Sequence, residues 1–279
     1  MRQFYSVFLF VIFLSSCGSN KLPTERFRQN IIYANQVKAG DTIKLVLKNS
    51  TPSPLRFNFS STDFNYNASL EKIGLLYVAG HTDTTLSFSY LVSELPPIKF
   101  GVFFGDDRRL VKKNLLALPF PSGKTYQIVQ GYNGTFSHNK ITSKYAIDFN
   151  LRLGDTVSAA DDGVVVGVVK DYSKNGSTEE WTDFANFITI YHAHSNLYTQ
   201  YVHLKQNGSI VKVGDTVKRH QPIGVVGLTG FTSVAHLHFN VLKPIKENWE
   251  STSINFEEGY SGTELIKGKL VKKPEFRED

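Results

Sequence analysis

A short motif occurs twice in the second half of the chain, and it constrains the fold more than any other feature. Gly154–Val157 reads Gly-Asp-Thr-Val and leads, after a turn, to the valine-rich run Gly163–Gly167; about sixty residues later Gly214–Val217 repeats the motif and leads to Gly224–Gly227. Each unit has the pattern of a turn, a short strand, a second turn and a buried strand. The repeat predicts a β-sheet or flattened barrel built from a duplicated element, with the aspartates capping turns.

The remaining sequence predicts further β structure. The 279 residues include 21 Phe and 13 Tyr, which favour strands, and no long segment has a helical period. Alternating apolar residues in 42–48, 56–60 and 85–92, separated by turn-rich breaks, predict an antiparallel β-sandwich-like domain. We therefore expect a mainly β chain in four parts after a leader and tether. These are an N-terminal β domain (30–95), a Pro- and Gly-rich linker (96–124), a second β domain (125–250) and a C-terminal extension (251–279) with a strand or two near 253–256 and a loose tail.

The first seventeen residues have the pattern of a bacterial lipoprotein signal peptide. A short basic head is followed by the apolar run Phe4–Leu14, which is too short for a stable transmembrane helix. Leu14–Cys17 resembles a lipobox, in which the cysteine becomes the lipidated first residue. Cys17 is the single cysteine of the chain, which fits an anchor better than a buried structural cysteine. We expect lipidation at Cys17, a polar tether over 18–29, and attachment to a membrane of the cell envelope.

The charge of the chain suits an envelope protein. The formal net charge is +6, which favours an anionic polymer or a membrane surface as neighbour. The Lys and Arg residues are scattered and form no basic stripe interleaved with aromatic residues, so nucleic acid is not indicated as a partner.

Two histidines in the last predicted strand are the first candidates for chemistry. His236 and His238 are separated by one residue within a run of β-forming residues, so their side chains project from the same face. Such a pair can ligate a metal, carry protons, or do one of each; it can equally be a partly buried, hydrogen-bonded pair. His192 and His194 form a second pair with the same spacing, but they run directly into a turn, and we interpret them as structural or exposed.

The order of several short segments then resembles a known enzyme family. From Tyr132 to Val241, roughly 110 residues, the chain is similar to the lysostaphin/LytM-type zinc endopeptidases, which cut peptidoglycan cross-bridges. The matching segments are Tyr145–Phe149, Gly154–Val157, Ala160–Val165, Tyr201–Leu204, Val211–Val217, Ile223–Gly230 and His236–Phe239. The Gly-Asp-x-Val turn alone also occurs in biotinyl and lipoyl carrier domains; the combination is specific.

This resemblance implies a zinc site that uses Asp148, His238 and one upstream histidine. His203 and His236 would then act on water and substrate. The chemistry is coherent, because a catalytic zinc takes three protein ligands and keeps a fourth position for water, whose pKa falls toward ~7. One histidine would serve as general base and the other as donor to the developing oxyanion; the sequence leaves the two roles open.

The upstream ligand is where the chain departs from the family pattern. Four residues before Asp148, where most members have a histidine, stands Lys144; the nearest upstream histidine is His138, ten residues before Asp148. If Asn139–Lys144 forms an inserted loop that returns the chain, His138 completes the site. Asn240 also stands where a glutamate commonly follows the His-x-His-Phe segment.

Two functions follow from these residues. The first is zinc-dependent hydrolysis of peptide bonds in peptidoglycan stem or cross-bridge peptides. The second, motivated by Lys144 and Asn240, is a catalytically degenerate module that binds peptidoglycan or regulates an amidase. The sequence leaves open which bond is cut, whether Gly-Gly, D-Ala to a diamino acid or another, and it does not indicate the oligomeric state.

Overall fold

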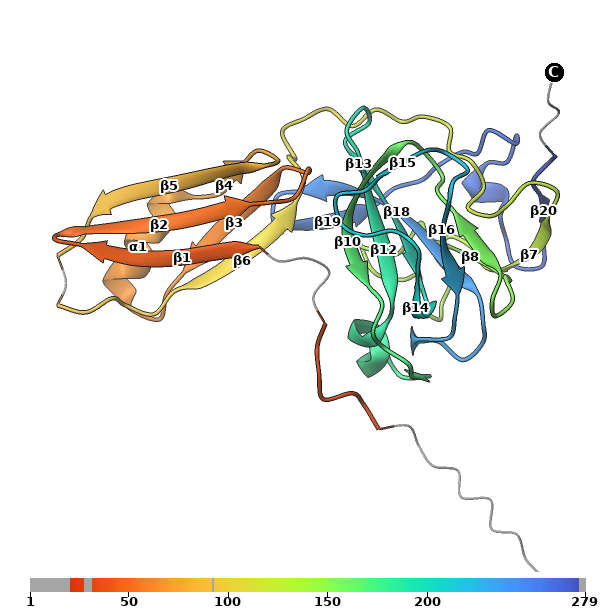
Figure 1. The fold of residues 1–279 in the computed structure, drawn as a ribbon, viewed down its shortest axis with the longest axis horizontal. Helices are drawn as coiled ribbons and strands as arrows, with labels where there is room; N and C mark the ends of the chain where they lie inside the picture. The colour runs from red at the N-terminus through yellow and green to blue at the C-terminus, as the bar shows by residue number, and fades with distance from the viewer. Residues whose placement is uncertain (1–20, 28–31, 92, 276–279) are drawn as a thin grey trace, which may run out of the picture.

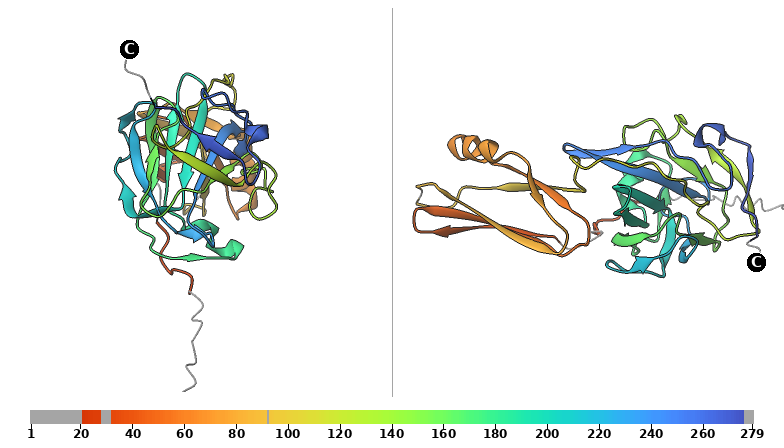
Figure 2. Two further views of the ribbon diagram at one scale, coloured as in Figure 1. Left: turned by 90° about the vertical axis from the view of Figure 1, so that its right-hand side faces the viewer. Right: turned by 90° about the horizontal axis from the view of Figure 1, so that it is seen from above.

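The computed structural model describes residues 21–27, 32–91 and 93–275, and Cys17 lies outside this range. The chain is mainly β, as predicted, and forms an elongated N-terminal domain beside a larger C-terminal domain (Figures 1 and 2). No helix in the described part is long and apolar enough to cross a membrane.

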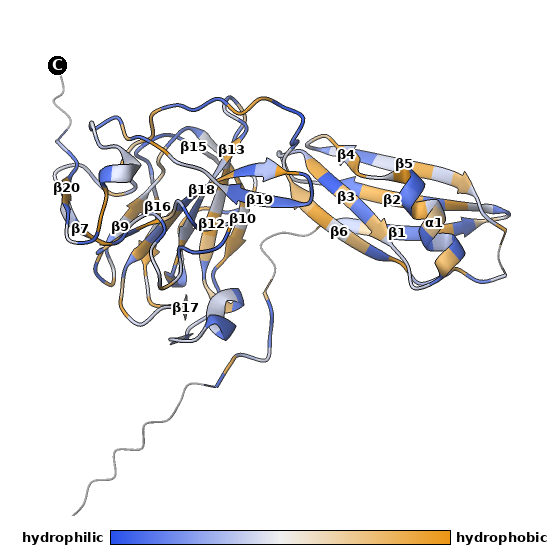
Figure 3. Ribbon diagram, turned by 180° about the vertical axis from the view of Figure 1, so that it is seen from behind, coloured by the Kyte–Doolittle hydropathy of each residue, from blue (hydrophilic) through white to orange (hydrophobic). Residues whose placement is uncertain are grey.

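The N-terminal domain consists of two three-stranded antiparallel sheets that share one core. Apolar residues at alternate positions of β2 (Ile43, Leu45, Leu47) and of β3 (Leu55, Phe57, Phe59) are buried together, so the period of two seen in the sequence predicts the inward faces correctly. Figure 3 shows the resulting mixture of apolar and polar positions along these strands. One sheet contains β1 (Tyr33–Ala39), β2 (Thr42–Asn49) and β5 (Thr82–Ser89), and the other β4 (Leu76–Val78), β3 (Leu55–Ser60) and β6 (Lys99–Phe104).

Two features of this domain were not predicted. The helix α1 (Phe64–Ile73) follows β3, and Asp63 caps it by accepting a hydrogen bond from the Tyr66 amide at 2.8 Å. It buries only Tyr66 and Leu70, so its apolar stripe is too narrow to stand out in the sequence. Strand β6 lies within the range predicted as linker. It belongs to the N-terminal domain, because it pairs with β3 along its whole length.

The C-terminal domain is built on a nine-stranded sheet. Eight strands follow the order β15-β10-β12-β13-β18-β8-β7-β20, and β19 pairs with β18. These strands are β7 (Thr125–Gln130), β8 (Ile147–Phe149), β10 (Gly163–Val169), β12 (Phe187–His192), β13 (Leu197–Val202), β15 (Thr216–Val217), β18 (Leu237–Ile245), β19 (Asn248–Ser251) and β20 (Leu270–Lys272). Smaller elements are the sheet β14-β16-β9 (Leu204–Ser209, Pro222–Val226, Thr156–Ser158), the pair β11 and β17 (Asn175–Gly176, Gly230–Phe231) and the 3₁₀ helices η1 (Glu179–Phe184) and η2 (Gly262–Glu264).

The two copies of the repeated motif exchange partners. Strand β9 of the first unit pairs with β16 of the second, and β15 of the second pairs with β10 of the first. The turns match as well: Asp155 accepts from the Arg152 amide at 2.8 Å and Asp215 from the Lys212 amide at 2.9 Å. The aspartates are therefore turn caps, as predicted, and the exchange holds the two halves of the domain together.

The C-terminal extension is more ordered than the sequence indicated. Strand β20 pairs with β7 at the edge of the large sheet, and Lys273 is buried, donating from Nζ to the Leu118 carbonyl at 2.7 Å. Around 253–256 the structure has isolated β-bridges in place of the expected strands. Strand β20 was not recognised in the sequence, because it has only three residues, lies beside charged residues and shows too little alternation of apolar and polar positions.

A buried arginine connects the two domains. Arg56 of β3 is fully buried and donates to the Phe104 carbonyl at 2.7 Å, to the Lys246 and Asn248 carbonyls at 3.3 Å each, and to the Ile245 carbonyl. The last three acceptors lie at the turn of the β18–β19 hairpin. The N-terminal domain therefore holds the tip of the hairpin whose first strand carries His238.

Part of the expected tether packs against the C-terminal domain. Arg26 forms an ion pair with Asp183, and the ring of Phe27 packs edge-on against Tyr172 with centroids 4.8 Å apart. Tyr172 and Trp181, two aromatic residues near η1, are buried in a small cluster of their own. They anchor the loop around η1 and do not face solvent as substrate contacts would.

Candidate metal centre

Two of the predicted site residues face each other because of strand register. Asp148 on β8 is paired directly with His238 on β18, and Nδ1 of the histidine lies 2.9 Å from Oδ1 of the aspartate. Their strand neighbours Ile147, Phe149 and Leu237 point the other way, into the main core. The apolar alternation of β8 and β18 thus places both polar side chains on the opposite face of the sheet.

The loop between β7 and β8 brings His138 to the same point. His138 is fully buried, and its Nε2 lies 3.1 Å from Asp148 Oδ1 and 3.1 Å from His238 Nδ1. Its Nδ1 lies 2.8 Å from the Gly131 carbonyl, which can only accept a hydrogen bond. Nδ1 therefore carries the proton, and the lone pair of neutral Nε2 points into the cluster.

The three converging atoms require a positive charge between them. Burial alone would lower the pKa of His138, but its contact with Asp148 raises it; burial would raise the pKa of Asp148, yet His236, His138 and His238 hold it well below its usual range. A carboxylate oxygen and two imidazole lone pairs within about 3 Å repel one another unless a proton or a cation lies among them. His138, Asp148 and His238 are accordingly the group in the described chain whose ligand atoms are arranged for a metal ion.

Gln130 orients the ligands from behind, a role that no motif in the sequence indicates. Its Nε2 donates to Asp148 Oδ2 at 3.1 Å and to Ser137 Oγ at 2.9 Å, while its Oε1 accepts from the Phe136 amide at 3.1 Å. One side chain on β7 thereby fixes the second oxygen of Asp148 and the start of the loop that carries His138. Such partners fix the orientation of metal ligands.

His203 and His236 lie beside these three residues. The Nδ1 of His203 donates to the Thr229 carbonyl at 2.7 Å, so the neutral ring presents an unprotonated Nε2; the Nδ1 of His236 donates to the Val234 carbonyl at 3.0 Å, which leaves its Nε2 on the side of Asp148. The two ring centroids are 4.7 Å apart, and His236 Nε2 is 3.6 Å from Asp148 Oδ1. Burial, with His236 and His238 nearby, holds the pKa of His203 well below its usual value.

The backbone of His203 is unusual. Its φ of +66° lies in the left-handed region, between the end of β13 and the start of β14. Left-handed backbone at a residue other than glycine is uncommon and concentrates where structure or function requires it. Here the conformation turns the imidazole into the site.

The residues that departed from the family pattern hold the loop that carries His138. Lys144 points away from the ligands and pairs with Glu250 on β19 at 2.9 Å. Asn240, on the floor of the site, donates to the Thr142 carbonyl at 2.6 Å and accepts from Ser251 Oγ at 2.8 Å. Neither side chain lies among the three converging ligand atoms, which come from His138, Asp148 and His238.

The second histidine pair lies elsewhere. His192 is buried and bonded to the Asp162 carbonyl at 2.7 Å and Thr199 Oγ1 at 2.9 Å; half-exposed His194 pairs with Asp161 at 3.0 Å. Both positions agree with the interpretation as structural or exposed residues.

A groove of about 280 Å³ opens beside the metal centre. Its floor is formed by the exposed face of the sheet, including Gln200, Val202, His238 and Asn240, and Trp249 lies at its edge. One wall is the loop that carries Ser137, Lys140 and Ser143, and the other contains η1 and Phe231. An extended peptide in this groove would pass His203 and His238.

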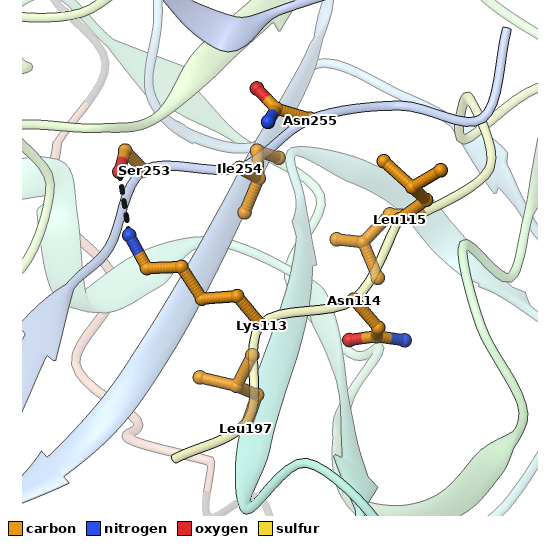
Figure 4. A pocket seen from close by; sticks show the side chains of 8 residues that line it. Lys113, Asn114, Leu115, Leu197, Ser253, Ile254 and Asn255 are labelled. Atoms are coloured by element: carbon orange, nitrogen blue, oxygen red, sulfur yellow. Dashed lines mark hydrogen bonds between the residues drawn. The ribbon is translucent and has the colours of Figure 1, made fainter.

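A second hollow, of about 300 Å³, has no comparable chemistry. It is shown in Figure 4, where Lys113 donates to Ser253 Oγ at 3.1 Å beside Leu115, Leu197 and Ile254. Its lining includes no histidine and no carboxylate. The groove beside the histidines is thus the candidate binding site.

Comparisons with known proteins match the part of the chain that forms most of this groove. Residues 142–255 match the sequence family described as Peptidase family M23. Peptidoglycan DD-endopeptidase ShyB of Vibrio cholerae is 34% identical over 176 residues, which is 60% of this chain and 38% of that protein. Glycyl-glycine endopeptidase ALE-1 of Staphylococcus capitis is 34% identical over 97 residues, 34% of this chain and 23% of that protein. The chain therefore spans well under half the length of these relatives.

Solved structures that are similar to this chain include a zinc-containing peptidase from Vibrio cholerae. It is 19% identical, with a TM-score of 0.37, and the match covers 76% of this chain and 78% of that one.

Proposed function

We propose that this chain, whose residues 142–255 belong to peptidase family M23, is a zinc-dependent endopeptidase that hydrolyses peptide bonds in the stem or cross-bridge peptides of peptidoglycan. The observation that carries the proposal is the convergence of one carboxylate and two imidazoles within 3.1 Å of one another beside a groove. Two further histidines, His203 and His236, are each held at Nδ1 by a backbone carbonyl and direct Nε2 toward the same space.

The ligand set fits zinc. His138, His238 and Asp148 would hold the ion through Nε2, Nδ1 and Oδ1, and two nitrogens with one oxygen suit this metal. Three protein ligands leave a fourth position, the arrangement of catalytic sites. When bound, zinc supplies a Lewis acid that acidifies water and polarises a peptide carbonyl.

The chain's own residues would handle the protons. His203 accepts the proton of the attacking water at Nε2, because its Nδ1 is held by the Thr229 carbonyl and its lowered pKa keeps it neutral. His236, whose Nδ1 is held by the Val234 carbonyl and whose Nε2 lies 3.6 Å from Asp148 Oδ1, would donate from Nε2 to the developing oxyanion or to the leaving amine when its ring carries a second proton. The groove floor would hold the peptide in extended form beside His203 and His238.

We also propose that the protein is a lipoprotein of the cell envelope, anchored through Cys17. The support is the leader sequence and its lipobox-like end. Growth with labelled palmitate should label the wild type and leave Cys17→Ser unlabelled and released from the membrane fraction. Equal labelling of the two would exclude this anchor.

The enzyme assignment is tested by metal content and by product analysis. Purified protein should contain about one zinc per chain, as expected for a three-ligand site, and should release muropeptides from whole peptidoglycan. His238→Ala should lose both properties, whereas His81→Ala, an exposed turn residue in the N-terminal domain, should keep both. Zinc-free wild type that releases no muropeptides would exclude the assignment.

A further inference from the structure

The two walls of the groove are joined by an ion pair. Nζ of Lys140, on the loop between β7 and β8, lies 3.1 Å from Oε2 of Glu179, the first residue of η1. Both residues line the groove that also contains His203 and His238. Among the described residues of its lining, they are the charged side chains other than histidines.

A second contact between the walls lies nearby. Phe136, from the same loop as Lys140, stacks on Phe231 of β17 with ring centroids 4.7 Å apart. The backbone on each side is fixed independently: Ser143 Oγ donates to the Ser137 carbonyl at 2.7 Å, and buried Trp181 anchors η1. Each wall therefore keeps its shape without the ion pair.

We propose that Lys140 determines specificity by binding a free carboxylate of the substrate peptide, and that Glu179 occupies the place of this carboxylate in the free protein. The proposal rests on the proposed peptidase function. Glu179 already demonstrates that a carboxylate fits against Lys140 inside the groove. Both side chains are more than half exposed, and an exposed pair contributes only ~0–1 kcal/mol, so a substrate can replace Glu179 at little cost.

This inference distinguishes between the bonds left open above. A diamino-dicarboxylic acid whose second amine forms the cross-link keeps a free carboxylate next to that amide. A bridge made of glycine has no side-chain carboxylate. The structure therefore favours a D-alanyl to diamino-acid linkage over Gly-Gly as the substrate.

The two members of the pair should respond in opposite directions. Lys140→Met removes the cation and should lower kcat/KM for the carboxylate peptide about fivefold to tenfold. Glu179→Gln removes the internal competitor and should lower KM for the same peptide about twofold to fivefold. If the pair only holds the walls together, both variants should lose activity alike.

The experiment compares a D-alanyl-diaminopimelate cross-linked peptide with the same peptide carrying a carboxamide at the free carboxylate. Wild type should prefer the carboxylate peptide, and Lys140→Met should lose that preference. The double variant Lys140→Glu/Glu179→Lys should restore the ion pair but not the preference for the carboxylate peptide. Lys218→Met and Asp162→Asn, which alter an exposed pair of 3.2 Å outside the groove, serve as controls and should keep it. A preference that survives Lys140→Met, or returns with the reversed pair, would overturn the proposal.

A non-hydrolysable ketomethylene analogue of each peptide separates this inference from the proposed function. Binding that depends on Lys140 and on the carboxylate, without any cleavage of the natural peptides, would support the inference and contradict the hydrolase. Cleavage of both natural peptides, with or without Lys140, would support the hydrolase and contradict the inference. Neither binding nor cleavage would contradict both.

Discussion

The metal centre should depend on a residue that touches no ligand. Asn240 bonds to the Thr142 carbonyl at 2.6 Å and to Ser251 Oγ at 2.8 Å, and the same Ser251 oxygen accepts from the Tyr145 amide at 3.1 Å. These bonds fasten the end of the loop that carries His138 onto the β18–β19 hairpin. We predict that Asn240→Ala weakens zinc binding more than it weakens the fold.

The magnitude follows from what the change leaves behind. Asn240 is buried, so its removal deprives the Thr142 carbonyl and the Ser251 hydroxyl of a partner, at about 1–3 kcal/mol for each buried group. Part of this cost is relieved if the loop loosens, and a loosened loop holds His138 less firmly. Loss of an outer partner of a metal site typically lowers affinity about 10- to 100-fold, which we expect here.

The assay is competition for zinc between the protein and a chromophoric chelator, combined with urea unfolding. Gln200→Ala is the matched control, since Gln200 lies on the same groove floor but contacts Thr189, at 3.4 Å, and not the loop. It should bind zinc like the wild type. If Asn240→Ala also keeps wild-type zinc affinity while its stability falls, Asn240 is a core residue only and the argument for the loop is refuted.

Three more predictions concern other parts of the molecule. His203→Ala should retain zinc yet lose activity about 10²- to 10⁴-fold in muropeptide release, and loss of zinc together with activity would contradict its role as a base. Arg56→Met should lower the free energy of unfolding by about 2–4 kcal/mol in urea titrations, because it removes charged donors from buried hairpin carbonyls; an unchanged midpoint would contradict this. Burial lowers the pKa of Lys273 to about 8 from 10.5, so the unfolded chain binds more protons between these values and stability rises with pH there. The free energy of unfolding of wild type relative to Lys273→Met should therefore rise by about 2–3 kcal/mol from pH 8 to 10.5, and a flat difference would refute this.

The parts of the fold that were predictable are those in which residue order determines geometry. Alternation identified the inward faces of β2 and β3, and the repeated Gly-Asp turns identified the duplicated element, whose partner exchange the structure then reveals. The resemblance to the lysostaphin/LytM-type family agrees with the match of residues 142–255 to the sequence family described as Peptidase family M23. The helix α1 was missed because two buried residues make too weak a pattern.

The unpredicted features depend on contacts between residues far apart in sequence. Arg56 looks like any surface arginine until the fold places it under the β18–β19 turn. Lys273 likewise looks like part of a charged tail, although it is buried against Leu118. Gln130 shows the same limit at the site itself, since nothing in the chain marks its bonds to Asp148 and Ser137. Charged and polar residues are called exposed by default, and only the tertiary structure identifies the few that are buried with partners.

The three ligand residues of the metal centre are positioned in two different ways, so substitutions should affect them differently. Asp148 and His238 are fixed by the register of two paired strands, which no single side-chain substitution shifts. His138 comes from a loop whose position depends on side-chain bonds through Asn240, Lys144 and Gln130. The hairpin that receives two of these bonds is itself held at its tip by Arg56. Zinc affinity should therefore be limited by the loop ligand, and substitutions along this path should weaken the metal site while leaving Asp148 and His238 paired.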